Sequence, residues 1–214
     1  MSEQDTVFLV DGDAGFRRAL TRTLGAAGLA VREFASATAF LCQHDPDQPG
    51  CALLDMRLPD LNGLALQKAL LAAGDRRPVI FMARYGDVAA SVCAMKAGAT
   101  DFLTKPFDDT ALLAALYEAL ARDRRAREIA SRLDAIRCRL AALTPREHEV
   151  MRHVVEGRLN KQIASELGIA EKTIKVHRAR AMEKMCAKSV ADLVRQTLEF
   201  RLGMVLGVGD RLQE

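Results

Sequence analysis

Three aspartates and one lysine stand where a phosphoryl-transfer site could form. Asp11 and Asp13 follow one short apolar run, Asp55 follows a second, and Lys105 follows a third and precedes a proline. Carboxylate oxygens are the ligands that Mg²⁺ prefers, and a lysine ammonium group can neutralise a phosphoryl oxygen. These four side chains therefore predict an oxygen-rich site for Mg²⁺ and a phosphoryl group, provided that the fold brings them together.

The chain around these residues alternates short apolar runs with helical patterns. Three runs are apolar throughout and two are weaker, at residues 7–10, 51–54, 79–82, 30–34 and 99–103. Continuous apolar runs are typical of strands buried on both faces of a parallel sheet. Five strand–helix units within residues 1–121 predict a parallel, doubly wound α/β sheet. Such sheets hold their functional groups at the carboxyl ends of the strands, where the aspartates and the lysine would meet.

Composition excludes several classes of protein. The chain of 214 residues is 50% hydrophobic and 28% charged, which is typical of globular domains. It has no stretch of about 18 uncharged apolar residues that could span a bilayer. Its five cysteines are scattered and form no Cys-x-x-Cys pair, which argues against a disulfide framework and a thiolate zinc site. The acidic first residues, Met-Ser-Glu-Gln-Asp, are unlike a signal peptide, so we expect a cytoplasmic protein with no membrane partner.

The charge is unevenly distributed along the chain. Residues 1–121 carry 11 Lys and Arg against 15 Asp and Glu, whereas residues 122–202 carry 19 against 11. A basic second half favours a polyanion as its partner. Charge alone leaves open that this is only chance surface composition.

The ordered motifs of the first half resemble the receiver domain of bacterial response regulators. The matching segments are VDGD, LLDMRLPDLNG and DFLTKPF, and GDVAASVCAMKAGATDFLTKPF is similar to the FixJ-like branch of that family. The resemblance covers residues 6 to 121 and implies a flavodoxin-like fold.

The resemblance also implies a role for each candidate residue. Asp55 would be the phosphoacceptor, whose carboxylate attacks a phosphohistidine of a partner sensor histidine kinase. Mg²⁺ would be held by Asp11, Asp13, Asp55 and the backbone carbonyl of Arg57. Lys105 would bind the incoming phosphoryl group.

Two positions depart from the pattern of receiver domains. The family has two adjacent acids after the first strand, but here Gly12 takes the second place and Asp13 follows one residue later. Fewer carboxylate ligands should weaken the metal site. The second departure is Ala83, where the family has Ser or Thr, whose hydroxyl couples the phosphoryl group to an aromatic switch, here Phe102. Without that hydroxyl, a neighbour such as Arg84 or Tyr85 would have to compensate.

These departures leave two hypotheses open. One is a receiver that switches on phosphorylation, and the other is a pseudo-receiver that binds partners without turnover of phosphate. A third hypothesis, an enzyme, rests on the resemblance of VDGD to the first motif of haloacid-dehalogenase-type phosphatases. That hypothesis leaves Asp55, Lys105 and the second half of the chain unexplained, so we expect no enzyme.

From Leu112 onward the sequence has an uninterrupted helical pattern. We interpret its later part, residues 122–142, as a linker helix. Its later apolar residues have the spacing of a coiled-coil seam over two heptads, at Ile129, Leu133, Ile136, Leu140 and Leu143. Two heptads are too few for a stable isolated coiled coil. The helix could support dimerisation or could pack on its own domain.

The remaining residues predict a small all-α domain that contains a helix-turn-helix. Thr144, Pro145 and Glu147 form a capping box with proline at the first helical position. We expect this helix to end at Gly157, Asn160 to cap a short second helix through Leu167, and a third helix to follow from residue 171 to about 185. A fourth would start at Ser189. Two helices around a glycine-containing turn place the second one in the major groove of DNA.

The segment LTPREHEVMRHVVEGRLNKQIASELGIAEKTIKVHRARAMEKM closely resembles the LuxR-type DNA-binding domain. The match spans residues 143–200 and implies binding of double-stranded DNA as a homodimer, with the last helix, 189–200, at the dimer interface. Ala170 departs from the family, which has a capping Ser or Thr before the recognition helix. The side chains that we expect to face DNA are Lys161, Lys172, Thr173, Lys175, Val176, His177, Arg180 and Lys184.

Together these patterns divide the chain into four parts. We expect a receiver at residues 1–121, a helical linker at 122–142, a LuxR-type domain at 143–202 and a tail at 203–214.

Overall fold

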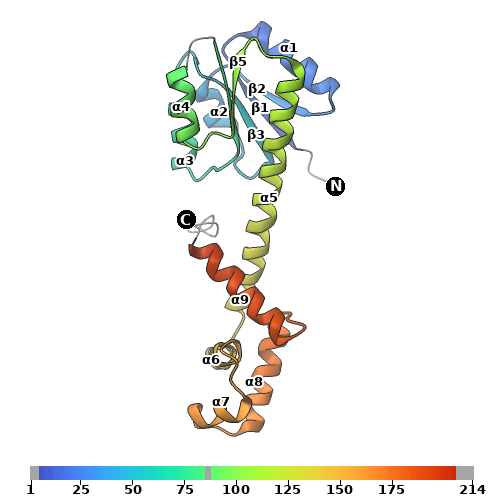
Figure 1. Ribbon diagram of the computed structural model, residues 1–214, viewed down its shortest axis with the longest axis vertical. Coiled ribbons are helices and arrows are strands. Elements are labelled where there is room, and N and C mark those ends of the chain that lie inside the picture. Colours follow the sequence, from blue (N-terminus) through green and yellow to red (C-terminus); the bar gives the residue numbers. More distant parts are fainter. Residues whose placement is uncertain (1–4, 85–87, 206–214) are drawn as a thin grey trace. The chain divides into compact units, whose positions relative to one another are not determined.

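The computed structural model describes residues 5–84 and 88–205. The chain divides into two compact units, residues 1–126 and 127–214 (Figure 1). The elements of the first unit are β1 (Thr6–Val10), α1 (Ala14–Ala26), β2 (Ala30–Phe34), α2 (Ala37–Gln43), β3 (Gly50–Asp55), α3 (Gly63–Ala72), β4 (Val79–Arg84), α4 (Val88–Lys96), β5 (Asp101–Lys105) and the first part of α5 (Asp109–Ala141). The second unit holds the rest of α5, α6 (Pro145–Val155), α7 (Asn160–Leu167), α8 (Glu171–Lys184) and α9 (Val190–Val205).

The first unit is the predicted doubly wound sheet. All strand pairs are parallel and the strand order is β2-β1-β3-β4-β5, the flavodoxin-like order. The central strands β1, β3 and β4 are buried on both faces, because alternate residues point to opposite sides, whereas the edge strands β2 and β5 are partly exposed. In β1, Phe8 and Val10 join one core with α2, α3 and α4, whereas Val7 and Leu9 join another with α1 and α5. Helices therefore cover both faces of the sheet (Figure 1).

One strand lies further along the chain than its apolar run predicted. The run 99–103 indicated the strand, but β5 is Asp101–Lys105 and pairs with β4 from Ile80 onward. Ala99 and Thr100 instead complete the turn after α4, where the N–H of Ala99 donates to the carbonyl of Ala94. As a result Lys105 is the last residue of its strand and not part of the loop that follows.

The second unit is the predicted helical domain, and its first helix starts as expected. The Thr144 hydroxyl accepts from the N–H of Glu147, and the Glu147 carboxylate accepts from the N–H of Thr144, which completes the capping box. At α9 the Ser189 hydroxyl accepts from the N–H of Asp192, as predicted. The prediction for Asn160 was wrong, because Leu159 holds the N-cap position of α7. The Asn160 side chain instead accepts from Arg178 of α8 at 2.9 Å.

The last two turns of α5 pack on the helical domain. Ile136 is buried in its core, and Leu140 and Leu143 pack against that core. Leu133 is also buried, and its side chain lies where a Cβ on Gly203 of α9 would collide with it. Ile129 of the same predicted seam is exposed. Packing on its own unit therefore accounts for most of the apolar spacing that also fitted a coiled coil.

Candidate functional site

Two carboxylates and one lysine meet at the carboxyl ends of the central strands. Asp11 follows β1, Asp55 ends β3 and Lys105 ends β5. The Lys105 Nζ lies 2.7 Å from Asp11 Oδ2 and 2.5 Å from Asp55 Oδ2. Parallel strands end at the same edge of the sheet, which is why residues 94 and 50 positions apart in the chain bind each other there.

Each carboxylate is bound in the same way. Its second oxygen accepts a backbone N–H from two residues further along, from Asp13 to Asp11 Oδ1 at 2.8 Å and from Arg57 to Asp55 Oδ1 at 2.7 Å. Asp11 is buried, and this burial raises its pKa, while the hydrogen bond from Lys105 acts in the opposite direction. Asp55 is only half-buried. Asp55 is therefore the more accessible of the two carboxylates from solvent.

Asp13 has a role that the sequence did not predict. It is the N-cap of α1, and its Oδ1 accepts from the N–H groups of Gly15 at 2.8 Å and Phe16 at 3.0 Å. These two hydrogen bonds hold the pKa of Asp13 below its usual range, and the one from Phe16 has the larger effect. We expected Asp13 to replace the acid that is missing at position 12, but its carboxylate instead binds the N-terminus of α1.

The donors at this site still fit Mg²⁺. Within residues 5–84 and 88–205 no three His, Cys, Asp or Glu side chains cluster as a metal site. What remains is the pair of carboxylates, Asp11 and Asp55, and the carbonyl of Arg57, whose loop is held by an isolated bridge to Asn62. Mg²⁺ commonly takes one or two carboxylates and keeps several waters. The Lys105 ammonium balances one of their two negative charges, so a net negative charge remains for a metal ion.

Both departures from the receiver pattern lie beside these residues. Gly12 is exposed, and a Cβ there would be 3.4 Å from Pro59 Cδ, an ordinary contact. Ala83 is buried in β4 and pairs with Thr104 of β5, whereas Phe102 is half-buried on the face of α2, α3 and α4. Arg84 is exposed at the end of β4, and Tyr85 lies outside the described residues. The switching roles of Ala83 and Phe102 stay predictions.

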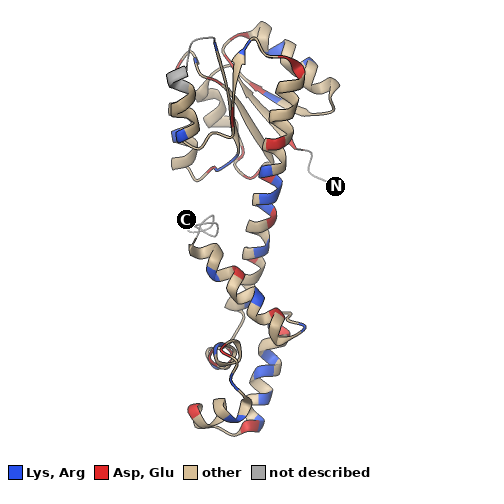
Figure 2. Ribbon diagram, in the orientation of Figure 1, with Lys and Arg blue, Asp and Glu red and all other residues tan. Residues whose placement is uncertain are grey.

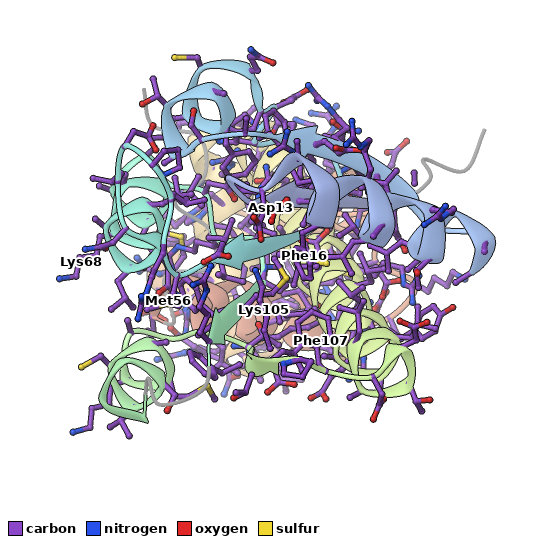
Figure 3. The ribbon with its side chains drawn as sticks, turned by 90° about the horizontal axis from the view of Figure 1, so that it is seen from above. Asp13, Phe16, Met56, Lys68, Lys105 and Phe107 are labelled. Carbon is purple, nitrogen blue, oxygen red and sulfur yellow. The ribbon has the colours of Figure 1, made fainter. Side chains whose placement is uncertain are left out.

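Sequence reasoning missed an aromatic residue in this site. Lys105 Nζ lies 4.0 Å from the centroid of the Phe16 ring, and Phe16 packs edge-on against Phe107. Figure 3 shows Asp13, Phe16, Lys105 and Phe107 near one another at this edge of the sheet. In the sequence Phe16 is one apolar residue among many, and no local signal separates a core phenylalanine from one that contacts a cation.

The second candidate site is the solvent-facing side of α8. Lys172, Thr173, Lys175, Val176 and Arg180 are exposed on this helix, and His177 is half-buried. Lys161 is exposed on α7. Basic side chains recur along α8 (Figure 2), and Lys175 pairs with Glu171 at 3.2 Å in an exposed contact of small energy. As expected, Ala170 holds the N-cap of α8 without a side-chain hydrogen bond.

Lys184 is bound within the helical domain. Its Nζ lies 2.6 Å from Glu147 Oε2 and 3.0 Å from the carbonyl oxygen of Ala142. Glu147 is buried, and the hydrogen bonds from Lys184 and from the N–H of Thr144 lower its pKa to about 2. An unpaired buried carboxylate would be costly, so we expect this lysine to stabilise the packing of α6 and α8. That role differs from the DNA contact predicted for it.

No helix within the described ranges is long and apolar enough to cross a membrane.

Comparison with known proteins identifies two family domains in this chain. Residues 7–117 match the family described as response regulator receiver domain, and residues 141–197 match that described as bacterial regulatory proteins, luxR family. The chain is 43% identical to nodulation protein W of Bradyrhizobium diazoefficiens over 92% of its length and 86% of that protein. It is 42% identical to the transcriptional regulatory protein FixJ of Azorhizobium caulinodans, over 92% of this chain and 94% of that one.

Solved structures of response regulators are also similar to this chain. The response regulator StyR is 42% identical and superposes with a TM-score of 0.87, over 92% of this chain and 99% of that one. Full-length FixJ from B. japonicum is 37% identical with a TM-score of 0.57, over 94% and 99%. With this fold, a carboxylate–lysine cluster at its strand ends and a helix-turn-helix behind it, the chain belongs to the NarL/FixJ-type response regulators of two-component systems, which join a receiver domain to a LuxR-type DNA-binding domain.

Proposed function

We propose that Asp55 accepts a phosphoryl group and that this modification controls binding of DNA by the second domain. The observation that carries the proposal is the Lys105 ammonium shared between Asp11 and Asp55 at the carboxyl end of the sheet. A carboxylate oxygen of Asp55 attacks phosphorus, an O–P bond forms, and the bond from phosphorus to the donor breaks, with the electron pair leaving on the donor. In the cell that donor is a phosphohistidine of a sensor histidine kinase.

The side chains around Asp55 then have separate tasks. The N–H of Arg57 orients the Asp55 carboxylate, and Lys105 offsets the negative charge that the phosphoryl group brings. Asp11, Asp55 and the Arg57 carbonyl would hold Mg²⁺, which when bound neutralises phosphoryl oxygens. Asp13 contributes by holding the first turn of α1.

For the second domain we propose binding of double-stranded DNA as a homodimer, in the cytoplasm. The exposed basic side chains of α8, among them Lys172, Lys175 and Arg180, are suited to phosphates and base edges of the major groove. On α9, Leu198, Leu202 and Val205 are exposed at spacings of four and three, which gives the helix an apolar face. Leu198 lies within residues 189–200, where we predicted the dimer interface, and Leu202 and Val205 continue the same apolar face.

The proposal is tested by incubating the full chain with Mg²⁺ and acetyl phosphate. Intact mass and dimer content are followed for the wild type and for Asp55→Asn. We expect one phosphate adduct and a larger dimer fraction in the wild type, and neither in Asp55→Asn. An adduct that persists in Asp55→Asn would assign the phosphoacceptor to another residue.

A second candidate is a pseudo-receiver, which the glycine at position 12 and the alanine at position 83 favour. Its DNA binding would depend on protein concentration or on a partner protein. The absence of an adduct in the wild type would support it. An adduct without dimerisation would instead assign the defect to coupling at Ala83.

We also propose that the chain is not an enzyme, and its family is one of transcriptional regulators. A haloacid-dehalogenase-type phosphatase would use Asp11 as its nucleophile. Hydrolysis of a phosphomonoester that is lost in Asp11→Asn and kept in Asp55→Asn would contradict our proposal.

A further inference from the structure

The Lys105 ammonium group has an aromatic neighbour in addition to its two carboxylates. Its Nζ is 4.0 Å from the centroid of the Phe16 ring, within the range of a cation–π interaction. An ammonium group has three N–H donors, and the carboxylates of Asp11 and Asp55 take two of them. The ring therefore covers a further side of the same cation.

Phe16 is held by contacts that do not involve Lys105. It is the third residue of α1, and its N–H donates to the N-cap side chain of Asp13 at 3.0 Å. Its ring packs edge-on against Phe107, with 6.2 Å between centroids and 73° between planes. Both rings also pack against the core beneath α1 and α5. Figure 3 shows these side chains at the edge of the sheet.

We propose that Phe16 is a positioning residue for Lys105, whose ring keeps the ammonium group between Asp11 and Asp55 until a phosphoryl group arrives. A lysine side chain has a flexible four-carbon stem, so fixing its ammonium group costs conformational entropy. A ring already fixed by Asp13 and Phe107 lowers that cost, because the cation enters a prepared site. The inference rests on the proposed role of Asp55 as phosphoacceptor.

The position of Lys105 can be measured without any phosphoryl group. The full-length protein is treated briefly with acetic anhydride, and acetylation of Lys105 is quantified by peptide mass spectrometry relative to Lys68, an exposed lysine on α3. A lysine released from the ring and the carboxylates reacts faster. From the usual strength of a cation–π contact we expect Phe16→Leu to raise the relative labelling of Lys105 about 3- to 10-fold.

Two further variants separate positioning from packing. Phe16→Trp keeps an aromatic face and should restore the labelling of the wild type. Phe107→Leu loosens the Phe16 ring without removing its aromatic face, and should raise Lys105 labelling less than Phe16→Leu does. Equal labelling of Lys105 in Phe16→Leu and the wild type would overturn the proposal, as would equal increases in Phe16→Leu and Phe107→Leu.

The same variants are then phosphorylated with acetyl phosphate and Mg²⁺ over a range of donor concentrations. We expect the maximum rate to fall about 3- to 10-fold in Phe16→Leu, and to recover in Phe16→Trp. Faster labelling of Lys105 with an unchanged maximum rate would overturn the functional part of the inference. Failure of the phosphoacceptor proposal can be distinguished from these outcomes, because neither the wild type nor any variant would then form a phosphate adduct. In that case Phe16 has no phosphorylation to assist, and the inference falls with the proposed function.

Discussion

Two carboxylates, Asp11 and Asp55, share one ammonium group at the carboxyl end of the sheet. Lys105 thus already balances one of the two negative charges that a metal ion would meet there. The missing acid at Gly12 matters more for that reason, since Asp13 caps α1 instead of replacing it. At the scale of single residues, we therefore predict that the affinity of this site for a metal ion depends on position 12, which carries no side chain.

Restoring an acid at position 12 should strengthen the metal site. The Cβ of Gly12→Asp would meet Pro59 Cδ at 3.4 Å, so the new side chain fits beside the loop after β3. A third carboxylate should raise the affinity for Mg²⁺ roughly tenfold, because affinity follows ligand charge and number. Titration calorimetry with MgCl₂ measures this directly. Gly12→Asn, which adds an amide of the same shape, is the control, and an equal gain in both variants would show that charge is not the cause.

At the scale of elements, polar side chains join α6 and α7 to α8 around the apolar core of the helical domain. Glu147 in the first turn of α6 binds Lys184 in the last turn of α8, and Asn160 at the start of α7 binds Arg178 of α8. Helix N-termini favour negative side chains and C-termini favour positive ones, so the pair of Glu147 and Lys184 suits both helices. These contacts fix α8 within the domain, while its exposed basic side chains take no part in the packing of the core.

The stability of the helical domain should depend on the ionisation of Glu147. Its pKa is lowered from 4.5 to about 2, so its contribution to stability is fully present above pH 4.5. That contribution is lost as the pH falls from 4.5 to about 2, because the unfolded state takes up a proton near pH 4.5 that the folded state binds only near pH 2. We expect the difference in Tm between wild type and Glu147→Gln to be largest near pH 6 and to shrink below pH 4.5. A difference that stays constant over this range, followed by circular dichroism, would refute the assignment.

Two lysines of α8 should respond differently to substitution. Lys175→Ala should weaken specific DNA binding by about 1–3 kcal/mol if the side chain reads a base edge, or reduce the salt dependence if it binds a phosphate. Lys184→Met should lower the Tm of the domain and leave DNA affinity unchanged at temperatures where the variant is folded. Binding isotherms at several salt concentrations, with Lys188→Ala as an exposed control, distinguish the two. A loss of affinity in folded Lys184→Met equal to that in Lys175→Ala would return Lys184 to the DNA interface.

At the scale of the whole molecule, the two units share one helix. α5 begins in the receiver, where Leu112 and Leu116 pack on the sheet, and ends in the helical domain, where Ile136 is buried. Phosphorylation at Asp55 can affect DNA binding only if the two states of the receiver differ in free energy toward dimers or DNA. The buried Ala83, which has no hydroxyl to bind a phosphoryl group, is the position where we expect this coupling to be weak.

Adding the hydroxyl at position 83 should strengthen the coupling. We expect Ala83→Thr to raise the ratio of DNA affinities with and without acetyl phosphate by several-fold, on the order of one hydrogen bond to a charged group. Ala83→Val is the matched control, because valine has the shape of threonine without its donor. The ratio is measured by DNA titrations of each variant with and without the donor. Equal ratios in Ala83→Thr, Ala83→Val and the wild type would show that position 83 does not limit the switch.

Much of this protein could be predicted from local sequence. The five strands of the sheet, its doubly wound class and the helices of the second half follow from apolar periodicity, and the caps at Thr144 and Ser189 follow from residue type. The meeting of Asp11, Asp55 and Lys105 follows from the rule that parallel strands end at one edge. These features depend only on neighbours in the chain or on the fold class, so they can be predicted from the sequence.

Tertiary structure decided which partner each polar side chain takes. The N–H groups of α1 engage Asp13, Glu147 engages Lys184 from 37 residues away, and the ring of Phe16 meets Lys105. Each of these side chains had another plausible partner, a metal ion, DNA or the core. The choice depends on distances of a few ångströms between elements that are remote in sequence, and no local pattern of residues encodes those distances.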